Sequence, residues 1–110
     1  METTAKQVNM AAVMVHSYDE YKSKYQKAII LIRDDDFYWT FRKDAEVVAK
    51  ECGILLNRNN IGSDNIEFAG FQQRKLDIYL PKLVRNGHRI AICDVEVQPA
   101  ERKRITERYC

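Results

Sequence analysis

The feature that most constrains the fold is a short aliphatic run in the first third of the chain. From Ala28 to Arg33 the sequence reads Ala-Ile-Ile-Leu-Ile-Arg, with no alternation of polar and apolar residues. Such a β-branched run is typical of a strand that is buried on both faces. It is far shorter than the ~20 residues that a membrane-spanning helix needs, so we expect no membrane partner.

Three segments show the spacing of apolar residues that is typical of helices, and they are predicted over residues 10–26, 43–52 and 76–84. Gly53 and the pair Asn86-Gly87 follow the second and third segments, where helices commonly end. Pro81 lies inside the third helix and removes one backbone donor, which predicts a kink. The apolar stripes consist of Met10, Met14, Tyr18, Tyr21 and Tyr25; of Ala45, Val48, Ala49 and Cys52; and of Leu76, Tyr79, Leu80, Leu83 and Val84.

Further short strands are predicted at residues 54–58, 66–69 and 89–95, with a turn-rich connection over 57–64 and a possible edge strand at 105–109. After the leading helix the order is β-α-β-β-α-β, which predicts an α/β (α+β) fold: a mixed β-sheet with about three packed helices. At 110 residues we expect one domain over 1–110, with 1–9 and 100–110 flexible or at an edge.

The motifs of common enzyme classes are missing from the sequence. Its four glycines stand singly, so no phosphate-binding loop of the type Gly-x4-Gly-Lys-Ser/Thr is present. The three cysteines and two histidines do not cluster as zinc ligands would. We therefore expect no catalytic residue, no cofactor and no metal. An odd number of widely spaced cysteines is typical of a reducing cytoplasm.

One alternative interpretation as an enzyme depends on the acidic triplet Asp34, Asp35 and Asp36, which follows the aliphatic run. Carboxylates at the end of a strand can hold Mg²⁺, and Asp94 and Glu96 could join them as in a metal-dependent nuclease. Consecutive carboxylates on an extended chain point in different directions, however. An acidic turn without a metal is therefore the favoured interpretation.

An aromatic cluster, Phe37-Tyr38-Trp39-Thr40-Phe41, stands between the first predicted strand and the second predicted helix. Aromatic residues at such a strand-to-helix junction most often belong to the core. In the functional interpretation, one ring instead enters a DNA groove as a wedge and unstacks a weak base step.

Three blocks of this sequence, in order, resemble the N-terminal, mismatch-sensing domain of the MutS DNA mismatch repair proteins. Residues 30–45 are similar to the family stretch in which a hydrophobic strand leads into Gly-Asp-Phe-Tyr-Glu-Leu-Phe and a helix that opens with Asp-Ala. Residues 68–71 are similar to Met-Ala-Gly-Ile/Val-Pro, and residues 79–94 to Tyr-Leu-x-Lys-Leu-Val-x-x-Gly-x-x-Val-Ala-Ile-Cys-Glu. The resemblance covers about residues 14–100 and implies a fold like MutS domain I.

The resemblance also implies a non-catalytic DNA-binding module. In the family, the Phe stacks on a mispaired base and the Glu two residues later hydrogen-bonds to that base. This sequence has Phe37 and Trp39 at these positions, and an indole cannot accept the hydrogen bond that a carboxylate accepts. Asp35 stands where the family has Gly, and Pro81 where it has a helical Ala. Because the family's ATPase lies in later domains, we expect an ATPase or repair protein supplied in trans to this stand-alone domain.

The expected partner is double-stranded DNA that is mismatched or kinked. The alternative is a protein-interaction module on the same fold that has lost mismatch binding. The acidic triplet favours the alternative, and the basic surplus over residues 82–110 favours DNA. The predicted DNA-binding residues are Phe37, Tyr38, Trp39, Arg42, Lys43, Arg58, Arg102, Lys103 and Arg104.

Overall fold

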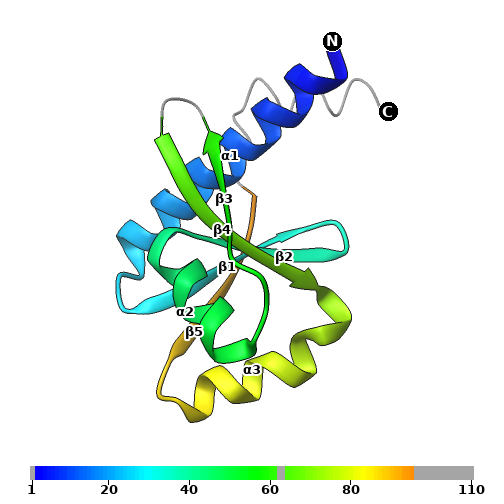
Figure 1. Ribbon diagram of the computed structural model, residues 1–110. Coiled ribbons are helices and arrows are strands. Elements are labelled where there is room, and N and C mark those ends of the chain that lie inside the picture. Colours follow the sequence, from blue (N-terminus) through cyan, green and yellow to red (C-terminus); the bar gives the residue numbers. More distant parts are fainter. Residues whose placement is uncertain (1, 62–63, 96–110) are drawn as a thin grey trace, which may run out of the picture.

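The computed structural model describes residues 2–61 and 64–95 of the chain, with the side chains of residues 11–61 and 64–95. The elements follow in the order α1 (Glu2–Lys24), β1 (Ala28–Asp34), β2 (Phe37–Phe41), α2 (Arg42–Cys52), β3 (Asn57–Ile61), β4 (Asp64–Gln72), the 3₁₀ turn η1 (Gln73–Lys75), α3 (Leu76–Arg85) and β5 (Arg89–Asp94) (Figure 1). The predicted α+β class is confirmed.

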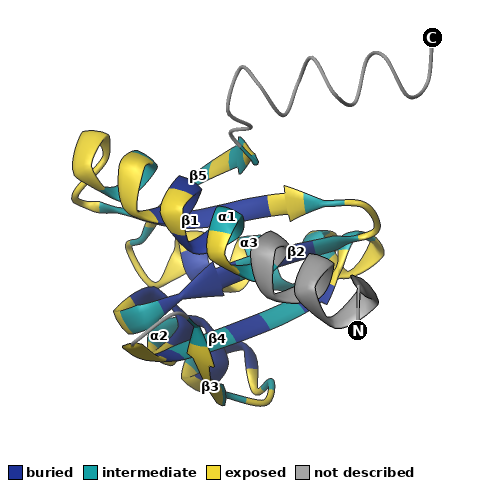
Figure 2. Cartoon of the chain, turned by 90° about the horizontal axis from the view of Figure 1, so that it is seen from above, coloured by how far each residue is buried: buried dark blue, intermediate teal, exposed yellow. Residues whose placement is uncertain are grey.

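The five strands form one mixed sheet in the order β3-β4-β2-β1-β5. The pair β1–β5 is parallel, whereas β1–β2, β2–β4 and β3–β4 are antiparallel. Strand β1 therefore has a neighbouring strand on each side and lies in the interior of the sheet. Figure 2 shows the buried residues concentrated in the sheet and on the inward sides of the helices.

Helices cover both faces of the sheet, as the aliphatic run of β1 requires. Ile30 and Ile32 point to the face that is covered by α1, where they pack with Tyr18. Ile29 and Leu31 point to the opposite face, in a cluster with side chains of α2 and α3. All four isoleucine and leucine residues of β1 are buried, and this confirms the prediction of a strand buried on both faces.

The structure corrects the expected elements around the aromatic cluster. Residues 37–41 are not a junction between a strand and a helix but a strand of their own, β2, which forms a hairpin with β1. Strand β4 does not stop at Gly70 but runs on to Gln72, and it pairs with the whole of β2. The aromatic residues thus belong to the middle of the sheet.

Two further differences concern a polar strand and the helix boundaries. Strand β3 covers 57–61, in the stretch that was expected to be a turn, while 54–56 forms a connection. Helix α1 extends from Glu2 to Lys24, so it begins eight residues before the predicted start at 10 and ends two before the predicted end at 26. In α3, Leu83 is buried as predicted, but Leu80 is only partly buried and Val84 is exposed.

No helix in the described part of the chain is both long and apolar enough to span a membrane. The possible edge strand at 105–109 and the cations Arg102, Lys103 and Arg104 lie outside the described residues.

Candidate nucleic-acid interface

The β1–β2 hairpin ends in a tight turn formed by Asp35 and Asp36. Asp35 has a φ of 54°, in the left-handed region that Asp and Asn enter more readily than most residues. The turn is tied to η1 by Gln73, whose backbone N–H donates to the carbonyl of Asp36 at 2.7 Å and whose side-chain amide donates to the carbonyl of Asp35. These hydrogen bonds fix the end of the hairpin against the end of β4.

Three aromatic side chains, Phe37, Trp39 and Phe68, form what we call the aromatic stack. The rings of Phe37 and Trp39 lie nearly parallel, at 17°, with their centroids 5.3 Å apart. The ring of Phe68 on β4 lies 6.1 Å from that of Trp39 at 55°. All three side chains are only partly buried, on the α1 side of the sheet. Phe37 is thus accessible at the end of the hairpin, as a wedge must be.

Tyr38 points the other way, because side chains alternate along a strand. It is buried in the cluster that also holds Leu31 and Leu83, and its ring packs against that of Phe71 with centroids 5.7 Å apart. Tyr38 therefore belongs to the core, which corrects its assignment to a DNA-contacting surface.

The predicted cations of α2 and β3 lie at the opposite end of β2 from Phe37. Arg42 forms a bidentate ion pair with Asp19 of α1, at 2.9 and 3.0 Å. Lys43 is exposed, and Arg58 is exposed with Glu67 3.9 Å away. Four residue steps of about 3.3 Å separate the ends of β2, or roughly 13 Å. The structure therefore does not gather these cations around the wedge.

Arg42 and Lys43 instead line an open hollow of about 510 Å³ between α1 and the start of α2. Its lining also includes acidic side chains, and Arg42 is already paired with one of them. The hollow thus has mixed charge. Its lining residues are Tyr18, Asp19, Lys22, Ser23, Arg42, Lys43 and Glu67.

Two cations that the sequence analysis missed stand next to the hairpin end. Arg74 and Lys75 are exposed in η1, directly after the residue that is tied to the Asp35-Asp36 turn. Arg74 Nε donates to Gln72 Oε1 at 2.7 Å, and Gln72 is the register partner of Phe37. The run Gln-Gln-Arg-Lys after an apolar strand was the available signal, but only the pairing of β4 with β2 places it beside Phe37.

In the part of the chain that the structure describes, the acidic triplet and β5 do not form a metal site. Asp94 is held by Arg33, which reaches its two carboxylate oxygens at 2.9 and 3.1 Å, and this hydrogen bonding lowers the pKa of Asp94. Across the described ranges, no group of three or more His, Cys, Asp or Glu side chains is placed to hold a metal ion. Glu96, the other residue of that interpretation, lies outside these ranges.

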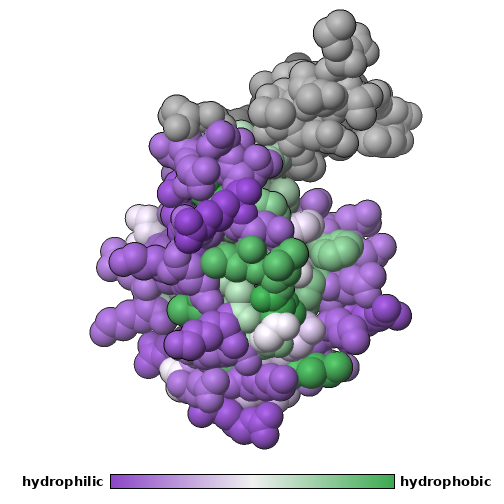
Figure 3. All heavy atoms as spheres, viewed as in Figure 1, coloured by the Kyte–Doolittle hydropathy of each residue, from purple (hydrophilic) through white to green (hydrophobic). Residues whose placement is uncertain are grey.

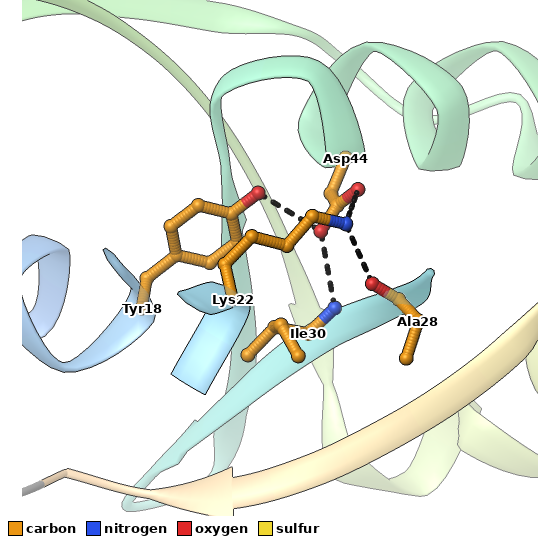
Figure 4. Close-up of polar contacts among 5 residues, drawn as sticks. All are labelled: Tyr18, Lys22, Ala28, Ile30 and Asp44. Atoms are coloured by element: carbon orange, nitrogen blue, oxygen red, sulfur yellow. Dashed lines mark hydrogen bonds and ion pairs between the residues drawn. The ribbon is translucent and has the colours of Figure 1, made fainter. Parts of the chain in front are cut away.

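A buried carboxylate fixes the end of β2 that leads into α2. Asp44 accepts hydrogen bonds from the Tyr18 hydroxyl at 2.9 Å, from Lys22 Nζ at 3.0 Å and from the backbone N–H of Ile30 at 3.1 Å (Figure 4). Lys22 Nζ also donates to the carbonyl of Ala28 at 2.6 Å. Burial, and after it the charge of Asp44, raise the pKa of Tyr18, so its hydroxyl remains a donor. These bonds join α1, β1 and α2 at one point.

The fold and this surface define a small α+β domain that presents an aromatic stack at one end of a central hairpin. Comparison with known proteins identifies the family. The family model described as MutS domain I matches residues 12–110. The chain belongs to the MutS domain I family.

Several curated relatives carry the name DNA mismatch repair protein MutS. The protein of Christiangramia forsetii is 40% identical over 104 residues, which are 94% of this chain and 12% of that protein. The protein of Porphyromonas gingivalis is 44% identical over 96 residues, 86% of this chain and 11% of that protein. The protein of Salinibacter ruber is 43% identical over 89 residues, 80% of this chain and 10% of that protein. The chain thus spans about a tenth of the length of these relatives.

Proposed function

We propose that this domain is a non-catalytic DNA-binding module that prefers mismatched or kinked duplexes and inserts Phe37 between bases as a wedge. The observation that carries the proposal is the position of Phe37, partly exposed and stacked on Trp39 at the end of a tethered hairpin. Membership of the MutS domain I family and the names of the relatives support the same function.

The wedge selects its duplexes by how easily they deform. Separating two stacked base pairs costs a few kcal/mol per step, and the cost is lowest at a mismatch or a flexible pyrimidine–purine step. Trp39 offers no acceptor to the mispaired base, so hydrogen-bond reading by this position does not contribute. Preference for distorted DNA then follows from stacking and deformability.

The test is a binding titration of Phe37→Ala with matched duplexes and with duplexes that contain one mismatch. Binding is measured by fluorescence anisotropy, and the titration is repeated over a salt series. The variant is expected to lose its preference for the mismatch and to keep weak, non-specific binding through phosphates. Leu55→Ala is the matched control, because it truncates an exposed apolar side chain away from the hairpin. An unchanged preference in Phe37→Ala would remove the wedge from the proposal.

Phosphate contacts come from the cations on either side of the aromatic stack. We assign them to Arg74 and Lys75 at the hairpin end and to Lys43 and Arg58 at the far end of β2. Arg102, Lys103 and Arg104, which lie outside the described residues, are proposed to add further phosphate contacts. Neutralising Arg74 and Lys75 to Gln should weaken matched and mismatched duplexes equally. It should flatten the slope of log affinity against log salt by about 0.9 per lost contact. Lys50→Gln, at an exposed position in the last turn of α2, is the control; a slope that changes as much in this control would place the contacts elsewhere.

The domain is proposed to work together with other parts of the mismatch repair machinery. These 110 residues hold no phosphate-binding loop, so an ATPase or another repair protein is the proposed protein partner. Cys52 is a buried thiol outside any disulfide, and this supports placing the domain in the cytoplasm.

A second candidate function is a protein-interaction module, and an exposed apolar patch favours it. Figure 3 shows apolar side chains grouped near the middle of one face, over the connection between α2 and β3. Leu55 in this connection is 75% exposed. This candidate predicts no duplex binding even at low salt, where phosphate contacts are strongest, so the same titration separates the two functions.

A further inference from the structure

The indole of Trp39 occupies the space above a glycine on the neighbouring strand. Trp39 and Gly70 are register partners in the β2–β4 pair. A Cβ atom at position 70 would lie 2.3 Å from Cε3 and 2.4 Å from Cζ3 of the indole, far inside any allowed contact. Gly70 is not among the glycines with a positive φ. Its small size is therefore required by the ring and not by the backbone.

The orientation of Phe37 depends on that ring. Phe37 is the first residue after the hairpin turn, and its ring meets that of Trp39 nearly face to face. The position of the Trp39 ring is restricted in turn by two residues of β4: Gly70, over which the ring lies, and Phe68, whose ring packs against it. A change at Gly70 that displaces the indole therefore also disturbs the neighbour on which the Phe37 ring stacks.

We propose that Trp39, seated on Gly70, is a positioning residue that holds the Phe37 ring in the orientation needed to stack on a base. This inference rests on the proposed function and deepens it. A ring that is already fixed loses little freedom on binding, so more of the stacking energy contributes to affinity for a base that is easily unstacked. Because the indole offers no acceptor, mismatches are ranked by ease of unstacking and not by their hydrogen-bonding pattern.

A purely structural role makes a different prediction. An aromatic ring that lies across from a strand glycine can stabilise the strand pair by covering the gap that the missing side chain leaves. In that case, loss of the ring would lower the melting temperature and leave the preference for mismatched DNA unchanged.

The experiment is a double-mutant cycle of Gly70→Ala and Trp39→Ala, read out by mismatch preference, with tryptophan fluorescence measured on the two proteins of the cycle that keep Trp39. Trp39 is the only tryptophan of the chain, so its emission reports directly on the stack in the free protein. Gly70→Ala should shift the emission to longer wavelength and reduce mismatch preference about tenfold, the scale of one base–aromatic stack. Affinity for matched duplex should stay within about twofold, since its phosphate contacts remain.

The cycle also contains the control. In the Trp39→Ala background there is no ring for the new methyl group to displace, so adding Gly70→Ala should change mismatch preference no further. If Gly70→Ala fails to fold, Phe68→Leu tests the same point, because it removes a neighbour of the indole without touching the glycine.

The outcomes separate this inference from the proposed function. If Phe37→Ala abolishes mismatch preference while Gly70→Ala shifts the emission and leaves the preference at the wild-type level, Trp39 has only a structural role and the inference is overturned. If Phe37→Ala itself leaves the preference unchanged, the wedge fails first and the inference falls with it. A reduced preference in both single variants, with no further loss in the double variant, supports the inference.

Discussion

The two ends of β2 carry aromatic residues on the same face of the sheet, yet they are built in opposite ways. At one end Phe41 is 2% exposed and lies edge-on to Tyr18, next to the buried carboxylate of Asp44. At the other end Phe37 is partly exposed and stacks on Trp39, which is itself partly exposed. Strand β2 thus has a buried end at Phe41, which we call the locked end, and a partly exposed end at Phe37, which we call the presented end. Under the proposed function, stability and recognition are therefore carried by different residues, four positions apart.

The largest difference is expected between two equal truncations, Phe41→Ala and Phe37→Ala. Loss of the buried Phe41 ring should lower the free energy of unfolding by about 4 kcal/mol, the usual cost of such a cavity. Loss of the partly exposed Phe37 ring should cost about 1 kcal/mol, since it gives up little more than one stacking contact. Denaturant melts of both variants check this. Equal losses would place Phe37 in the core and end its role as a wedge.

Removal of the carboxylate that locks the first of these ends should have the next largest effect. Asp44→Ala leaves Lys22 without its ion-pair partner and the backbone N–H of Ile30 without an acceptor, and it should cost about 3 kcal/mol. Asp19→Ala breaks the exposed pair with Arg42 and should cost less than about 1 kcal/mol. Chemical denaturation distinguishes the two. Similar costs would mean that Asp44 is no more important than a surface charge.

A smaller effect than that of Asp44→Ala is expected for Tyr18→Phe, which removes one hydroxyl from the same buried group of contacts. The lost hydrogen bond to Asp44 should cost about 1.5 kcal/mol at neutral pH. In the folded protein the pKa of Tyr18 lies above its ordinary value of 10.0, so above that pH the unfolded chain releases this proton first and stability falls as pH rises. Melts between pH 8 and pH 11 should show a shallower alkaline loss for Tyr18→Phe. Identical slopes would contradict a raised pKa.

The elements whose buried residues form a regular apolar pattern could be predicted from the sequence. The aliphatic run of β1 and the stripe of α2 each give one interpretation, because the residues that form each of these two patterns are apolar. Gly53 ends α2 in the left-handed conformation, with φ 69°, where the sequence placed a helix end. The three blocks of family resemblance added the class of domain, which the family match over residues 12–110 confirms.

The presented end of β2 and its surroundings could not be predicted in the same way. The sequence predicts only that the acidic triplet ends a strand, whereas Asp35 in the left-handed region makes it the turn of a hairpin. Strand β3 consists mostly of Asn and Arg and has little apolar pattern to detect, because it is an edge strand. Gly70 looked like a strand end because the ring that covers it comes from another strand. Such long-range pairings leave no periodicity in the sequence.

The tether between Gln73 and the hairpin turn has a mechanical consequence. Two hydrogen bonds clamp the carbonyls of Asp35 and Asp36 to the end of β4, so the tip that carries Phe37 is stiff before any partner arrives. When a rigid hairpin tip is pushed into a duplex, the hairpin changes little, and nearly all of the deformation occurs in the DNA because the DNA is the more flexible of the two. A persistence length of about 150 base pairs makes intact B-DNA resist that load, and a mismatch acts as a local soft point. Under the proposed function, the domain would then select a duplex by how far its helix bends against a rigid tip.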